Sequence, residues 1–170
     1  EYDLALDVVD GTTQASKGGF GASSLMVIAA KDSLYHTPLH YVQKMVYGEQ
    51  IKHECDLLIT DKLEDIVKKL TSMLGRPPIF CMLDRERHSY NINSARLAGA
   101  KVFLIPDCDV LACVEACLPE YERRFDVYYG IGGAPEAVLA ASAIKNLGGE
   151  IQCLVGNESA VLKTNDLVKD

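Results

Sequence analysis

The chain lacks an apolar stretch long enough to cross a membrane. Its longest such run, Leu25 to Ala30, is far shorter than the roughly 20 residues that a spanning helix needs. It also lacks a basic start followed by an apolar segment, so we expect no secretory signal and a cytoplasmic location. Basic residues are in deficit, with 17 Lys and Arg against 24 Asp and Glu. A nucleic acid or an anionic membrane is therefore not expected as the main partner, because both attract positive charge.

Cysteine pairs of the C-x-x-C type are absent, and no histidine stands at the spacing of a zinc site. The chain nevertheless holds six cysteines, most of them between apolar neighbours. We interpret them as small buried hydrophobic residues in a reducing compartment, in preference to disulfides. They are Cys55, Cys81, Cys108, Cys113, Cys117 and Cys153.

Length and composition suit one globular unit. The 170 residues are 48% hydrophobic and 24% charged, which excludes wholesale disorder. The chain begins directly in a segment that is typical of a strand, which suggests a fragment of a longer protein. We treat residues 1–170 as a single unit.

The pattern of residues predicts strands and helices in alternation. The expected strands cover residues 2–9, 24–30, 78–83, 101–106, 125–129 and 151–155. Helices are expected over 61–74, with Asp61 and Glu64 as a capping box, over 89–98, from a cap at Asp109 to 118, and from Pro135 to Gly148. Residues 34–50 are expected to form a short helix or an irregular segment. The class is α/β, with a largely parallel or mixed sheet flanked by helices.

Two carboxylates stand three residues apart where the first strand ends, in the run Asp7-Val-Val-Asp10-Gly11-Thr12. Carboxylate and hydroxyl oxygens can hold Mg²⁺ or Mn²⁺ against a phosphate. A plain Asx turn explains the same residues, because Asp-Gly is a common turn pair. Taken alone, the turn is the better explanation.

Further polar residues follow the later strands, whose carboxyl ends collect function in open α/β sheets. Arg85 and Arg87 could face one anionic group, although a solvated charge run is an equal alternative, and the adjacent His88 is more simply a polar residue than a ligand. Asp109 is explained as a helix cap, whereas Asp107 could accept hydrogen bonds from sugar hydroxyls. The remaining candidates lie in a glycine-rich loop that matches no nucleotide-binding pattern, and they are Gly132, Gly133 and Glu136.

In this order, the segments resemble the class II fructose-1,6-bisphosphatases, the bacterial type linked to glycerol use and gluconeogenesis, within the inositol monophosphatase-like superfamily. Five matches carry the resemblance and spread over nearly the whole chain. They are Asp7-x-x-Asp10-Gly-Thr12, Tyr41-x-x-Lys44, Arg85-x-Arg87-His88, Asp107-x-Asp109-Val110 and Gly130-Ile-Gly-Gly-Ala-Pro-Glu136.

The resemblance implies a layered carbohydrate phosphatase fold and metal-dependent hydrolysis of the 1-phosphate of fructose 1,6-bisphosphate, with sedoheptulose 1,7-bisphosphate as a second candidate substrate. It implies Mn²⁺ or Mg²⁺ as the cofactor and a dimer or tetramer as the assembly. Carried over by position, Asp7, Asp10 and Glu136 would be metal ligands, and Asp7, Thr12 and Glu136 would serve catalysis. Substrate binding would fall to Tyr41, Arg85, Arg87, Asp107, Asp109, Gly132 and Gly133.

The chain departs from the family in its length. Family members are considerably longer, and their first metal-binding carboxylates precede the Asp7-x-x-Asp10 element. We therefore expect this chain to be the C-terminal portion of such an enzyme. The alternative is a non-catalytic module that binds sugar phosphates and lacks a complete metal site.

Overall fold

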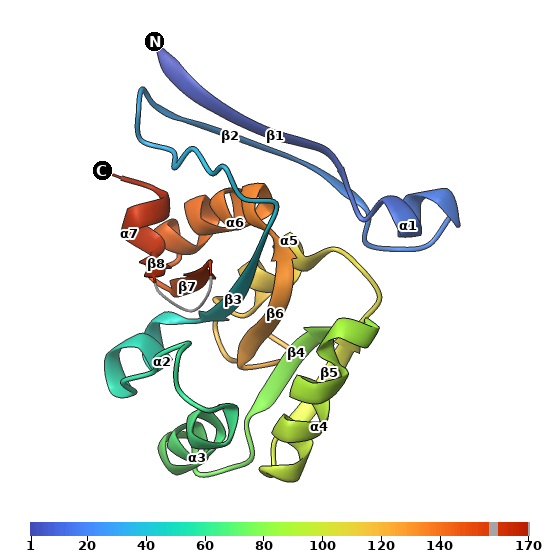
Figure 1. Ribbon diagram of the computed structural model, residues 1–170, viewed down its shortest axis with the longest axis vertical. Coiled ribbons are helices and arrows are strands. Elements are labelled where there is room, and N and C mark those ends of the chain that lie inside the picture. The colour runs from blue at the N-terminus through green and yellow to red at the C-terminus, as the bar shows by residue number, and fades with distance from the viewer. Residues whose placement is uncertain (157–159, 170) are drawn as a thin grey trace.

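The computed structural model describes residues 1–156 and 160–169, which form a six-stranded sheet and a separate hairpin (Figure 1). The strand order of the sheet is β5-β4-β6-β3-β7-β8, and the hairpin pairs β1 with β2. The predicted α/β class is confirmed. The elements are β1 (Tyr2–Asp10), α1 (Thr12–Ser16), β2 (Ser23–Ala30), β3 (Tyr41–Tyr47), α2 (Glu49–Glu54), α3 (Leu63–Leu74), β4 (Ile79–Leu83), η1 (Glu86–His88), α4 (Ser89–Leu97), β5 (Lys101–Ile105), α5 (Asp109–Glu115), β6 (Val127–Gly133), α6 (Ala134–Asn146), β7 (Glu150–Val155), β8 (Ala160–Lys163) and α7 (Thr164–Leu167).

The sheet is mixed rather than largely parallel. Strands β5, β4 and β6 run parallel, whereas β3 lies antiparallel between β6 and β7 and β8 returns antiparallel to β7. The parallel part brings the carboxyl ends of three strands to one edge. Because β3 runs the other way, its first residue reaches the same edge, where Tyr41 pairs with Gly133.

The prediction of a helix or irregular segment over residues 34–50 is wrong for its central part, which is strand β3 followed by α2. Helices cover both faces of β3, so its side chains show no apolar and polar alternation. Its middle residue, Lys44, is fully buried and interrupts the apolar run that would have marked a buried strand. The partner of that lysine, Asp109, lies 65 residues further on, where no local pattern points to it.

Two hydrophobic cores lie on the two faces of the sheet. Helices α3 and α4 bury their apolar sides on one face, and α5 and α6 cover the other. The helix predicted over residues 61–74 is confirmed as α3, in which Leu63, Ile66, Val67 and Leu70 are all buried. Its predicted capping box is wrong, because the helix begins after Lys62 without a side-chain cap and Asp61 accepts a hydrogen bond from Lys69 instead.

The β1–β2 hairpin forms an outer layer on α6, which lies between the hairpin and the sheet (Figure 1). Only its inner face is covered, so the strand expected over residues 24–30 is buried on one side alone. Side chains on the outer face of the hairpin are 57–65% exposed although they are apolar. These outer residues are Leu4, Leu6, Val8, Met26 and Ile28.

The glycine-rich run after residue 129 is part of strand β6 and not the predicted loop. Gly132 and Gly133 pair with the first residues of β3, and α6 begins at the next residue, Ala134. Pairing with β3 keeps the glycines in β6 up to Gly133, so the strand leads directly into α6 without a loop. The C-terminal strand β8 and helix α7 have no counterpart among the predicted elements.

Candidate functional site

A cavity of about 390 Å³ opens at the edge of the sheet where β4, β5 and β6 end, beneath the turn that follows β1. All eleven residues singled out as candidates line it, together with four neighbours. The residues that follow or end β4, β5 and β6 meet because parallel strands end at one edge of a sheet, whereas Asp7, Asp10 and Thr12 come from the separate hairpin and the turn after it. The lining residues are Asp7, Val9, Asp10, Gly11, Thr12, Thr13, Tyr41, Leu83, Arg85, Arg87, Asp107, Asp109, Gly132, Gly133 and Glu136.

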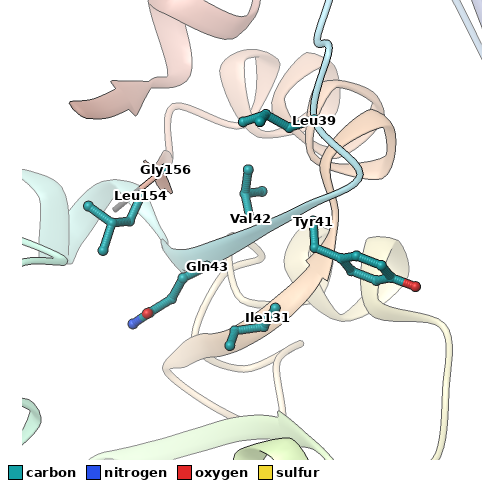
Figure 2. Close-up of a pocket in the computed structure, with 7 residues that line it drawn as sticks. All are labelled: Leu39, Tyr41, Val42, Gln43, Ile131, Leu154 and Gly156. Carbon is teal, nitrogen blue, oxygen red and sulfur yellow. The ribbon is translucent and has the colours of Figure 1, made fainter. Parts of the chain in front are cut away.

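A larger cavity, of about 710 Å³, lies beside β3 and differs in its chemistry (Figure 2). None of its seven described lining residues carries a charged side chain, and four of them are aliphatic: Leu39, Val42, Ile131 and Leu154. Tyr41 borders both cavities, and in Figure 2 its ring points away from Leu154 and Gly156. Since a phosphorylated ligand requires charged partners, the smaller cavity is the candidate functional site.

The turn after β1 places two carboxylates at the cavity in different environments. Asp7 accepts a hydrogen bond from the amide of Val9 at 3.1 Å. Asp10 is buried, and one of its oxygens, Oδ2, has no hydrogen-bond partner among the described residues. Burial, with the nearby carboxylates of Asp109 and Asp7, raises the pKa of Asp10 to about 6.

Glu136, in the first turn of α6, shares this feature. Its Oε2 is also buried without a hydrogen-bond partner in the described chain. Buried polar atoms are normally paired, so two unpaired carboxylate oxygens in one cavity suit a bound cation. No set of three His, Cys, Asp or Glu side chains among residues 1–156 and 160–169 is arranged to hold a metal ion. Asp10 and Glu136 therefore fit part of a divalent cation site.

The two candidate glycines make room for the chain's own carboxylates. A Cβ on Gly132 would stand 2.1 Å from Asp109 Oδ2 and 2.8 Å from Lys44 Nζ. A Cβ on Gly133 would overlap the Glu136 carboxylate, at 1.8 Å from Oε2. The two glycines therefore allow Asp109 and Glu136 to lie against β6.

Asp109 is not the helix cap that was predicted. Helix α5 starts at Asp109 itself, and the preceding Cys108 is the N-cap residue in a left-handed conformation, with φ 68°. The Asp109 carboxylate turns instead to the buried Lys44, with Oδ2 2.5 Å from Nζ. Lys44 appeared only as part of a family match and was not a candidate site residue.

The Arg85-Glu-Arg87-His88 segment is fixed to β6 by two contacts with Ile131. Arg87 donates to the Ile131 carbonyl through Nε and Nη2, at 3.3 and 3.0 Å, and lies over the ring of Tyr41. Arg85 lies 3.9 Å from Asp107. These contacts hold both arginines at the cavity, where the sequence left a solvated charge run as an equal alternative.

His88 makes the second contact and is completely buried. Its Nε2 accepts a hydrogen bond from the amide of Ile131 at 2.8 Å, and its Nδ1 lies 3.0 Å from the carbonyl oxygen of Leu83. Because an amide can only donate, Nδ1 must carry the ring proton. Burial lowers the pKa of His88 and keeps the ring neutral. The sequence suggested a polar residue without a specific role. Only the family match at Arg87-His88 could have indicated that His88 links Leu83 to Ile131.

All six cysteines are free, and five of them are buried, which confirms their interpretation as small apolar side chains; Cys55 is half-buried. Burial raises the pKa of the Cys81, Cys117 and Cys153 thiols to about 12. Such thiols stay protonated and unreactive at neutral pH. Among the described residues, no helix has the length and apolar character required to cross a membrane.

The fold and the cavity define an α/β protein with acidic and basic side chains gathered at one sheet edge. The sequence-family model of the bacterial, glpX-encoded fructose-1,6-bisphosphatases matches residues 1–167, so the chain belongs to that family. It is 39% identical to fructose-1,6-bisphosphatase 2 class 2 of Escherichia coli K12 over 154 residues, which are 89% of this chain and 47% of that protein. It is 38% identical to fructose-1,6-bisphosphatase class 2 of Haemophilus influenzae over 152 residues, or 88% of this chain and 44% of that protein. The chain thus spans less than half the length of these curated relatives.

Proposed function

We propose that this chain carries the substrate site and part of the metal site for hydrolysis of the 1-phosphate of fructose 1,6-bisphosphate, giving fructose 6-phosphate and phosphate. The observation that carries the proposal is the convergence of all eleven candidate residues on one cavity of a family member. Sedoheptulose 1,7-bisphosphate is a second candidate substrate. Gluconeogenesis and glycerol use are the proposed context, and the cytoplasm and a dimer or tetramer stay predictions.

Asp7, Asp10 and Glu136 are the proposed ligands for Mn²⁺ or Mg²⁺. The unpaired buried oxygens of Asp10 and Glu136 support this assignment. A divalent cation bound there would offset charge on the phosphoryl group and lower the pKa of an attacking water. Thr12, at the start of α1, lines the same cavity and would orient that water.

The basic side of the cavity is proposed to hold the distal 6-phosphate. Arg87 is oriented by its hydrogen bonds to Ile131, and its Nη1 has no hydrogen-bond partner in the described part of the chain. Tyr41 and Arg85 complete this side. Binding of the distal phosphate would fix the reacting phosphate in place, which converts binding energy into orientation.

Residues 1–170 are proposed to act as the C-terminal part of a larger fold. The exposed apolar face of the β1–β2 hairpin supports this, because a contiguous exposed apolar patch is typical of a surface that packs against other protein. The alternative is a sugar-phosphate-binding module without catalysis. One observation favours it: the described residues hold no group of three metal-binding side chains.

Phosphate release from fructose 1,6-bisphosphate in the presence of Mn²⁺ tests the proposal. Release that is lost in Asp7→Ala and Asp10→Asn, and is retained in Asp65→Asn, which removes an exposed carboxylate outside the cavity, would show that this chain supplies enough of the metal site for catalysis. Calorimetric binding of fructose 6-phosphate separates the alternatives. Binding without release would identify a binding module, and the absence of both would refute a sugar-phosphate site in this chain.

A further inference from the structure

A single lysine lies directly beneath the floor of the candidate site. Lys44 is in the middle of β3 and its side chain is 0% exposed. Its Nζ donates to Asp109 Oδ2 at 2.5 Å and lies 3.4 Å from the carbonyl oxygen of Gly133. Both partners line the cavity, whereas Lys44 itself does not. The Lys44 ammonium can therefore affect a ligand only indirectly, through Asp109 and Gly133, which a ligand could contact.

Packing alone does not account for this lysine. Burying an ammonium removes it from water, and an apolar side chain of similar volume often stabilises a core equally well or better. The nearby carboxylate of Asp109 opposes the effect of burial and holds the pKa of Lys44 above its usual range, so the group stays charged. Both of its hydrogen bonds end on residues that line the cavity. The charge is therefore placed where it affects the site.

The pair leaves one half of the Asp109 carboxylate available. Oδ2 is taken by Lys44, and Oδ1 makes no hydrogen bond within residues 1–156 and 160–169. Gly132 gives this arrangement its space, because any Cβ there would collide with Oδ2 and Nζ. The carboxylate is thereby oriented by Lys44 and open on one side. An ionised carboxylate accepts hydrogen bonds from hydroxyl groups and repels phosphate.

We propose that Lys44 is a positioning residue that fixes the Asp109 carboxylate as an acceptor for hydroxyl groups of the sugar, and so sets recognition of the polyol rather than of the phosphate. This inference rests on the proposed function. It predicts different effects on two ligands, since phosphate binding is proposed to depend on Arg85 and Arg87, which contact Asp107 and Ile131 rather than Lys44 or Asp109. If Lys44 had only a structural role, its replacement would weaken the binding of both ligands to a similar degree.

Calorimetry of Lys44→Met with two probes tests this difference. The probes are fructose 6-phosphate and ethyl phosphate, a phosphate monoester without hydroxyl groups. We expect the Kd for fructose 6-phosphate to rise at least about tenfold, the loss that goes with one charge-assisted hydrogen bond, and the Kd for ethyl phosphate to stay unchanged. Lys69→Met, which removes a lysine from an exposed pair with Asp61, should leave both constants unchanged.

A double variant, Lys44→Met with Asp109→Asn, removes both buried charges and covers the case in which Lys44→Met alone does not fold. It should fold as the unaltered chain does and show the same selective loss. Unchanged affinity for fructose 6-phosphate in either folded variant, or an equal loss for both probes, would overturn the role of Lys44. Failure of the unaltered chain to bind either probe would instead overturn the proposed function, and the inference with it.

Discussion

Replacing Gly132 by alanine tests the close packing beneath the cavity. The new Cβ would lie 2.1 Å from Asp109 Oδ2, 2.8 Å from Lys44 Nζ and 2.9 Å from Lys44 Cε. An ordinary contact is about 3.5 Å, so Asp109 Oδ2 must move by more than about 1 Å and the two Lys44 atoms by about 0.6–0.7 Å. Lys44 is fully buried and cannot move into solvent, whereas Asp109 can move only toward the cavity that it lines, away from Lys44. The substitution must therefore separate the pair or displace β6.

The expected loss of stability follows from these two costs. Overpacking a close-packed core costs about 1–3 kcal/mol, and breaking a buried ion pair costs about 3–5 kcal/mol. The two costs are alternatives in part, so we expect Gly132→Ala to lower the free energy of unfolding by about 3–5 kcal/mol. Gly130→Ala is the matched control in the same strand, since its Cβ would meet its nearest atoms at 3.3–3.5 Å. We expect a loss of no more than about 1 kcal/mol there.

Urea denaturation followed by far-ultraviolet circular dichroism measures both losses, and this probe suits a chain without tryptophan. Fructose 6-phosphate binding by the folded Gly132→Ala variant should weaken as in Lys44→Met. The reasoning is refuted if Gly132→Ala is within about 1 kcal/mol of Gly130→Ala, since the contacts would then be relieved without disturbing the ion pair.

Three further predictions concern the elements around the site. Asp126 is buried and accepts hydrogen bonds from Arg76 at 2.8 and 2.9 Å. Asp126→Ala should therefore lower the free energy of unfolding, measured by urea denaturation, by about 3 kcal/mol, and a loss under about 1 kcal/mol contradicts this. The neutral ring of His88, whose pKa is lowered, stabilises the fold fully above pH 6.5 and less as the pH falls through that lowered value. The stability gap to His88→Gln should therefore narrow between pH 7 and 5, and a constant gap refutes it. Arg87→Lys keeps the charge but loses the paired hydrogen bonds to Ile131, so calorimetry should show fructose 6-phosphate binding weakened about tenfold; an unchanged Kd contradicts this.

Much of the candidate site could be predicted because its residues stand at the ends of strands. Arg87, Asp107 and Gly133 are far apart in the sequence, yet each follows or ends a strand of the parallel part of the sheet. The rule that parallel strands end at one edge is enough to bring them together. Asp10 comes from the separate β1–β2 hairpin, and the order of strands along the chain does not predict where that hairpin lies relative to the sheet.

The residues that support the site could not be predicted in the same way. Lys44 interrupts an apolar strand, and its burial is tolerable only because Asp109 lies against it in the folded chain. His88 is polar by type, yet it is buried between Leu83 and Ile131. Local sequence patterns record the period of a helix or strand, whereas these residues are explained by partners that are distant in the sequence.

The sequence by itself determined the α/β class, the apolar stripe of α3 and the polar residues at the strand ends, because these depend on residue type and local periodicity. Tertiary structure alone decided that β3 enters the centre of the sheet and that the glycines of β6 lie in a strand. It also turned Asp109 from a predicted helix cap into the partner of Lys44. Burial makes the difference, because an ammonium that water would otherwise solvate is stable in the core only when a carboxylate from another element lies against it.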